Sequence, residues 1–70
     1  MAKEYYFYEF KRSGVFMAKK YDYLPDALNR AIIDIDTKLA QPVAVWNSHG
    51  IKIYKAIDLA RHYEEVKNEK

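Results

Sequence analysis

The first 21 residues hold two apolar segments separated by the dipeptide Ser13-Gly14. The first segment, "YYFYEFKR" (5–12), is dense in aromatic residues that favour β-strands, and "VFMAKKY" (15–21) resumes the apolar pattern. Two strands joined by so short a connection form a hairpin, in which Gly14 supplies the positive φ that a tight turn needs. We therefore predict an N-terminal β-hairpin.

Helical spacing replaces this pattern after residue 23. Pro25 and Asp26 suit the first turn of a helix, because Pro loses no hydrogen bond there and a carboxylate faces exposed N–H groups. The apolar positions follow the i, i+3, i+4 spacing of one buried face: Leu24, Leu28, Ala31, Ile32, Ile35 and Leu39. Asp34 and Asp36 fall mostly outside that face, so we predict that both lie on the solvated surface of the helix.

The second half repeats the succession of hairpin and helix. "PVAVWN" (42–47) predicts a strand, "SHG" (48–50) a turn, and "IKIYK" (51–55) a strand with Ile51 and Ile53 directed inward. The remaining residues predict a helix whose buried stripe holds Ile57, Ala60, Tyr63 and Val66.

The predicted order is therefore β-β-α-β-β-α. It gives an α+β fold class, a four-stranded antiparallel sheet with two helices packed on one face. Seventy residues make a single small domain, 1–70, whose ends at 1–4 and 67–70 we expect to be frayed.

Composition narrows the function classes. The chain has no Cys, which excludes a disulfide framework and fits a reducing cytosol. No apolar run approaches the roughly 20 residues of a membrane span, and the first residues lack a signal-peptide pattern, so we expect a cytoplasmic protein with no membrane partner. From its small size and its composition we expect a protein of bacterial or phage type. The formal net charge of +2 is too small to indicate a nucleic-acid partner by itself.

Motifs for catalysis and for metal binding are missing from the sequence. Gly14 and Gly50 stand alone at turns and form no phosphate-binding loop. His49 and His62 have no Cys or carboxylate at ligand spacing, and no Ser or Thr is paired with a recognisable base. We expect a protein that is not an enzyme and that needs no cofactor and no metal.

The aromatic strand raises the main functional question. Side chains alternate along a strand, so Tyr6, Tyr8 and Phe10 share one face, while residues 5, 7, 9 and 11 share the other. Because two helices cover one face only, aromatic rings must remain on the open face. Three interpretations stay open: tyrosines half-buried with their hydroxyls in water, a surface that contacts another copy or another protein, and a platform that stacks on single-stranded nucleic acid.

Our first hypothesis is a non-catalytic protein-interaction or regulatory module that self-associates, as a homodimer, through an aromatic sheet face or a strand edge. The residues proposed for that surface are Tyr6, Tyr8, Phe10, Trp46 and Tyr54. The alternative is a single-stranded DNA or RNA binding protein, and the residues proposed to contact phosphates are Lys11, Arg12, Lys19, Lys20 and Lys52. Trp46 is also consistent with a residue that anchors the sheet to the helices.

Overall fold

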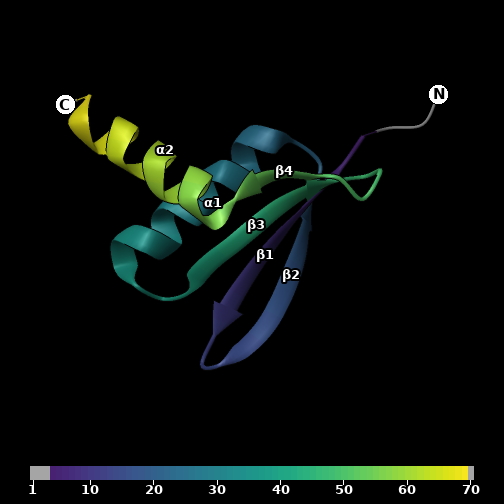
Figure 1. Cartoon of the computed structure of the whole chain (residues 1–70), viewed down its shortest axis with the longest axis horizontal. Coiled ribbons are helices and arrows are strands. Elements are labelled where there is room, and N and C mark those ends of the chain that lie inside the picture. The colour runs from purple at the N-terminus through teal and green to yellow at the C-terminus, as the bar shows by residue number, and fades with distance from the viewer. Residues whose placement is uncertain (1–3, 70) are drawn as a thin grey trace.

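The computed structural model describes residues 4–69. Its elements are β1 (Tyr6–Arg12), β2 (Val15–Tyr21), α1 (Leu24–Thr37), β3 (Gln41–Asn47), β4 (Lys52–Lys55) and α2 (Ala56–Asn68). The strands form one sheet in the order β2-β1-β3-β4, with every neighbouring pair antiparallel, and both helices lie on one side of it (Figure 1). The predicted α+β class and element order are confirmed. Helix α2 continues through Asn68, into the stretch expected to fray; residues 1–3 and 70 lie outside the described residues.

The connection between β1 and β2 is a two-residue turn. Ser13 and Gly14 both have positive φ, 53° and 80°. Positive φ at both central residues is the requirement of a type I′ turn, whose twist matches the twist of the flanking strands. The turn fixes an unbroken register in which Arg12 faces Val15 and Tyr6 faces Tyr21. The predicted hairpin is therefore confirmed, including the role of Gly14.

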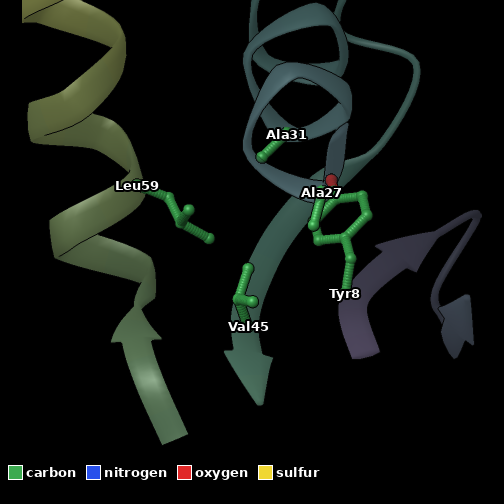
Figure 2. Packing of buried hydrophobic residues seen from close by; sticks show 5 residues of the cluster. All are labelled: Tyr8, Ala27, Ala31, Val45 and Leu59. Atoms are coloured by element: carbon green, nitrogen blue, oxygen red, sulfur yellow. The ribbon is translucent and has the colours of Figure 1, made fainter. Parts of the chain in front are cut away.

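The hydrophobic core lies between the sheet and the two helices (Figure 2). Tyr8 of β1 and Val45 of β3 are cross-strand partners, and both are fully buried. Ala27 of α1 lies beside the Tyr8 ring, and Ala31, one turn further along the helix, belongs to the same buried cluster (Figure 2). Leu59 of α2 packs in the same cluster (Figure 2). Both helices therefore contribute side chains to one core over the centre of the sheet.

A carboxylate is part of this core. Asp34 of α1 is 2% exposed, and its Oδ2 accepts a hydrogen bond of 2.7 Å from the Tyr8 hydroxyl. Its Oδ1 forms an ion pair with Arg30, at 3.1 Å from Nη2. This oxygen accepts no hydrogen bond within the described residues, because the Arg30 N–H groups are not aligned with it. The prediction that Asp34 lies on the solvated surface is wrong. Residues 27, 31 and 34 follow i, i+4, i+7, so Asp34 is directed at the sheet, where the Tyr8 hydroxyl offers it a donor.

The buried side of α2 also differs from the prediction. Leu59 is 1% exposed, whereas Ile57, two positions earlier, is 63% exposed. Because α2 starts directly after β4, the exit of the strand sets the rotation of the helix, and Asp58 stabilises this start by accepting a hydrogen bond from the backbone N–H of Lys55. Two residues differ by about 200° around a helix axis, so burying Leu59 exposes Ile57.

Helix α1 is shorter than its apolar pattern indicated. Lys38 adopts the left-handed conformation, with φ of 61°, and ends the helix after Thr37. Leu39 lies beyond this end and is 52% exposed, so its predicted place on the buried face is wrong.

Candidate functional site: the open face of the sheet

The side of the sheet opposite the helices carries a row of residues that crosses all four strands. Cross-strand partners share a face. Phe7 of β1 faces Lys20 of β2 on one side and Trp46 of β3 on the other, and Trp46 in turn faces Lys52 of β4. Two neighbouring rings are thus flanked by a lysine at each end.

Two further rows complete this surface. In the second, Glu9 lies between Ala18 and Ala44, and Ala44 faces Lys55; in the third, Lys11 lies between Phe16 and Gln41. Tyr5 joins the first row, since its ring meets that of Phe7 edge to face at 5.4 Å. We call these residues the open face: Tyr5, Phe7, Glu9, Lys11, Phe16, Ala18, Lys20, Gln41, Trp46, Lys52 and Lys55. Ala44 lies on the same side of the sheet but is fully buried.

Lysine side chains lie over the rings of the open face. The Nζ of Lys20 is 4.6 Å from the centre of the Tyr5 ring, and that of Lys52 is 5.0 Å from the centre of the Trp46 ring. Lys11 lies 5.4 Å from the ring of Phe16, which is 61% exposed. Cations at these distances are attracted by the ring faces, so each ammonium group is held close to an aromatic surface.

Glu9 fixes the orientation of the single tryptophan. The Trp46 indole N–H donates a hydrogen bond of 3.0 Å to Glu9 Oε1, across the β1–β3 pair. This bond holds the indole ring against the sheet. Four lysines and one glutamate give the open face a formal excess of three positive charges, larger than the +2 of the whole chain.

Most residues of the predicted interaction surface lie on the other side of the sheet. Tyr8 is in the core, and Tyr6, Phe10 and Tyr54 are partly buried against it, so their assignment to an exposed face is wrong. Trp46 is on the open face, where no helix covers it. The more apolar set of β1 faces the helices because burial there removes the most apolar surface from water.

The predicted phosphate-contacting residues divide between the two sides. Lys11, Lys20 and Lys52 lie on the open face. Lys19 faces Tyr8 on the helix side, with its Nζ 5.4 Å from the Tyr21 ring, and Arg12 has the same parity. The structure therefore brings three of the five together and removes Arg12 and Lys19 from that set.

The sequence reasoning missed most residues of this surface, among them the rings Tyr5, Phe7 and Phe16 and the charged residues Glu9 and Lys55. A signal for Phe7 was present, because its face of β1 also holds Glu9 and Lys11, whereas the Tyr8 face holds three rings in succession. Lys55 carried no such signal. The register of β3 and β4 shifts between Val45 and Trp46, and such an irregularity breaks simple alternation. Ile51, predicted to point inward, is 59% exposed.

Within residues 4–69, no group of three or more His, Cys, Asp or Glu side chains is placed to hold a metal ion. Neither helix of this region is long and apolar enough to cross a membrane. Comparison of the chain with protein-family models, with curated proteins and with solved structures gives no match.

Proposed function

We propose that the protein is a non-catalytic binding module that holds single-stranded DNA or RNA on its open face. The observation that supports this most directly is the row Lys20, Phe7, Trp46, Lys52, in which two adjacent rings lie between two cations. Single strands offer both groups that such a row attracts, because every base has a π-face and every linkage carries a negative charge.

The two parts of this surface have separate roles in the proposal. Phe7 and Trp46 sit on neighbouring strands, and base stacking on such rings contributes about 1–3 kcal/mol per base. Lys20 and Lys52 lie at the two edges of the sheet, so they contact the backbone on either side of the stacked bases. Neither contact reads a base edge, so we expect little sequence preference.

Charge argues against the first hypothesis in one of its two forms. Pairing two open faces would bring two surfaces with the same positive excess together, and like charges across an interface cost several kcal/mol. An anionic partner removes that cost. Self-association through a strand edge does not oppose these charges in the same way. The absence of Cys supports a cytoplasmic location as part of the same proposal.

Two neighbouring lysines provide the matched test. Lys19 and Lys20 are neighbours on β2, and replacing either by alanine changes the net charge of the protein by the same amount. They lie on opposite faces of the sheet. Fluorescence anisotropy of labelled mixed-sequence single-stranded DNA and RNA, titrated at low and moderate salt, should show binding that weakens as salt rises. Lys20→Ala should lower the affinity and reduce the slope of log K against log salt by about 0.7, because one phosphate contact is lost.

Lys19→Ala is the control and should leave both the affinity and the salt slope close to those of the unmodified protein. Absence of binding at low salt contradicts the proposal. Equal effects of the two substitutions would also contradict it, because they would show that net charge matters and the face does not.

A further inference from the structure

The two edge strands of the sheet differ in how well they resist pairing with another chain. Strand β4 has four residues, a register irregularity beside it, and a lysine at each end. These are features that natural sheets use to protect an edge. Strand β2 has seven residues in unbroken register with β1, and it begins with three exposed apolar residues, Val15 (58%), Phe16 (61%) and Met17 (47%).

The turn determines which backbone groups of β2 are exposed at the edge. In a two-residue hairpin the residues that flank the turn, here Arg12 and Val15, exchange both backbone hydrogen bonds. Hydrogen-bonded pairs alternate along an antiparallel ladder, so every second residue of β2 bonds to β1. Phe16, Ala18 and Lys20 are the residues between them, and they direct their N–H and C=O groups away from the sheet.

We propose that β2 pairs antiparallel with β2 of a second copy of this chain, about a two-fold axis at Ala18. In this register Ala18 faces Ala18 of the second copy, and Phe16 faces Lys20 of the second copy in both directions. All three outward-directed residues then exchange both backbone hydrogen bonds. The hydrogen-bonding pattern of one strand thus matches that of the other.

The side chains are compatible with this register and exclude the registers nearer the end of the strand. Met17 faces Lys19 of the second copy on the helix side, and Phe16 meets a lysine on the open face, which is an arrangement that a cation and a ring favour. Moving the two-fold axis from Ala18 to Lys19, away from the turn, would place Lys19 opposite Lys19 of the second copy. Moving it on to Lys20 would place Lys20 opposite Lys20. Like charges directly opposite each other destabilise a strand pair.

The resulting sheet has eight strands, with the helices of both copies on one side and both open faces on the other. Pairing at β2 therefore joins the two basic aromatic surfaces edge to edge. The inference stands on the edge strand itself, and its test contains no nucleic acid, so it succeeds or fails separately from the proposed function.

The absence of native cysteine makes the register directly measurable. Facing residues in a hydrogen-bonded pair have Cα atoms about 5.5 Å apart, within the span of a disulfide. Ala18→Cys should therefore form a covalent dimer under mild oxidation, seen on a non-reducing gel. Lys20→Cys is the matched control, because its Cα lies at least about 13 Å from the same position of the second copy, four residues along the strand.

Positions 18 and 20 are both exposed on the same face, so exposure alone predicts similar rates of cross-linking for the two variants. Faster cross-linking of Ala18→Cys than of Lys20→Cys would therefore support the register. Equal or reversed rates would overturn it. For the unmodified protein, sedimentation equilibrium should give a mass that rises from monomer to dimer with concentration. A monomer mass over the whole accessible range would overturn the inference as well.

A charge pair at one position distinguishes this dimer from general stickiness of an apolar edge. Phe16→Lys places a lysine opposite Lys20 of the second copy twice per dimer, so the dissociation constant should rise by at least about tenfold. Phe16→Glu removes the same ring but places a carboxylate opposite that lysine, so the dimer should persist. Equal weakening by both variants, with the fold intact by circular dichroism, would contradict the pairing.

Discussion

The two faces of β1 carry similar residues but are put to different use. Tyr6, Tyr8 and Phe10 face the helices, and Tyr8 is fully buried with its hydroxyl bonded to Asp34. Phe7, only one position away, is 37% exposed and lies between Lys20 and Trp46. What decides whether a ring is core or surface here is its parity along the strand and what covers that side.

The partners of the rings differ in the same way. On the helix side, the polar partner of Tyr8 is the buried carboxylate of Asp34. Removing either group leaves the other buried without a hydrogen-bond partner, which destabilises the folded protein. On the open face, the partners are lysines whose charged ends remain near water. Changes on the first side should therefore act on stability, and changes on the second on binding.

The largest expected effect is the loss of the Tyr8 ring. Tyr8→Ala should destabilise the domain by about 3–5 kcal/mol, because it creates a cavity and leaves Asp34 without its donor. A domain of 70 residues has a total stability of roughly 4–10 kcal/mol, so this variant should be largely unfolded on warming. Thermal melting followed by circular dichroism measures the change.

Phe7→Ala is the comparison for Tyr8→Ala. It removes a ring from the neighbouring position of the same strand, and it should cost no more than about 1 kcal/mol because the ring is already partly in water. Similar losses of stability for the two variants would contradict the division of β1 into a core face and an open face.

The next effect concerns the buried hydrogen bond. Tyr8→Phe and Asp34→Leu each leave one group of the pair without its partner, and each should cost about 1–3 kcal/mol. The double variant should cost less than the sum, since no orphaned group then remains; urea unfolding of the four proteins measures the coupling.

Tyr63 and Asp36 provide a control for that pair. Their hydrogen bond of 3.0 Å is exposed, and both partners can bond to water when it is lost. Tyr63→Phe should have no measurable effect on stability. A coupling near zero between Tyr8 and Asp34 would show that burial does not strengthen their contact.

The pH dependence of stability gives a smaller and more specific effect. Burial, together with the hydrogen bond to Asp34, raises the pKa of Tyr8 above the ordinary tyrosine value of 10.0. The unfolded chain therefore releases this proton at lower pH than the folded one, so the contribution is complete below pH 10 and is lost as pH rises above it. The expected slope is about 1.4 kcal/mol per pH unit.

Tyr8→Phe isolates this effect from the other tyrosines, whose titration it leaves in place. Chemical unfolding of both proteins between neutral and strongly alkaline pH should show a shallower decline above pH 10 for the variant. Parallel declines would show that Tyr8 titrates normally in the folded protein.

The sequence was sufficient to predict the fold, because apolar spacing changes from strand to helix period at clear turn signals. It was not sufficient to choose the face of β1, since both sets of residues begin with aromatic rings. The charged residues Glu9 and Lys11 distinguish the two sets, because the set that contains them lies on the open face. Asp34 was predicted to be solvated because it is charged. Its helical spacing from Ala27 and Ala31, which places it on the buried face, was given less weight.

Simple alternation in β4 directed Ile53 inward and Lys52 outward, as observed, but it failed for Ile51, Tyr54 and Lys55. The register shift opposite Trp46 depends on how β4 pairs with β3, which local patterns do not encode. The unprotected edge of β2 was also hidden until the strand order was known, because an edge is defined by the missing neighbour.

The central claim is that the open face stacks on single strands, and Trp46 reports on it directly. It is the only tryptophan of the chain and lies in the row with Phe7. We would titrate the protein with unlabelled single-stranded DNA and RNA at low salt and record its tryptophan emission. The account predicts saturable quenching that is reversed by added salt. In Phe7→Ala, the affinity obtained from the quenching curve should be about tenfold lower. Unchanged emission at saturating oligonucleotide, or quenching indifferent to Phe7→Ala, would contradict it.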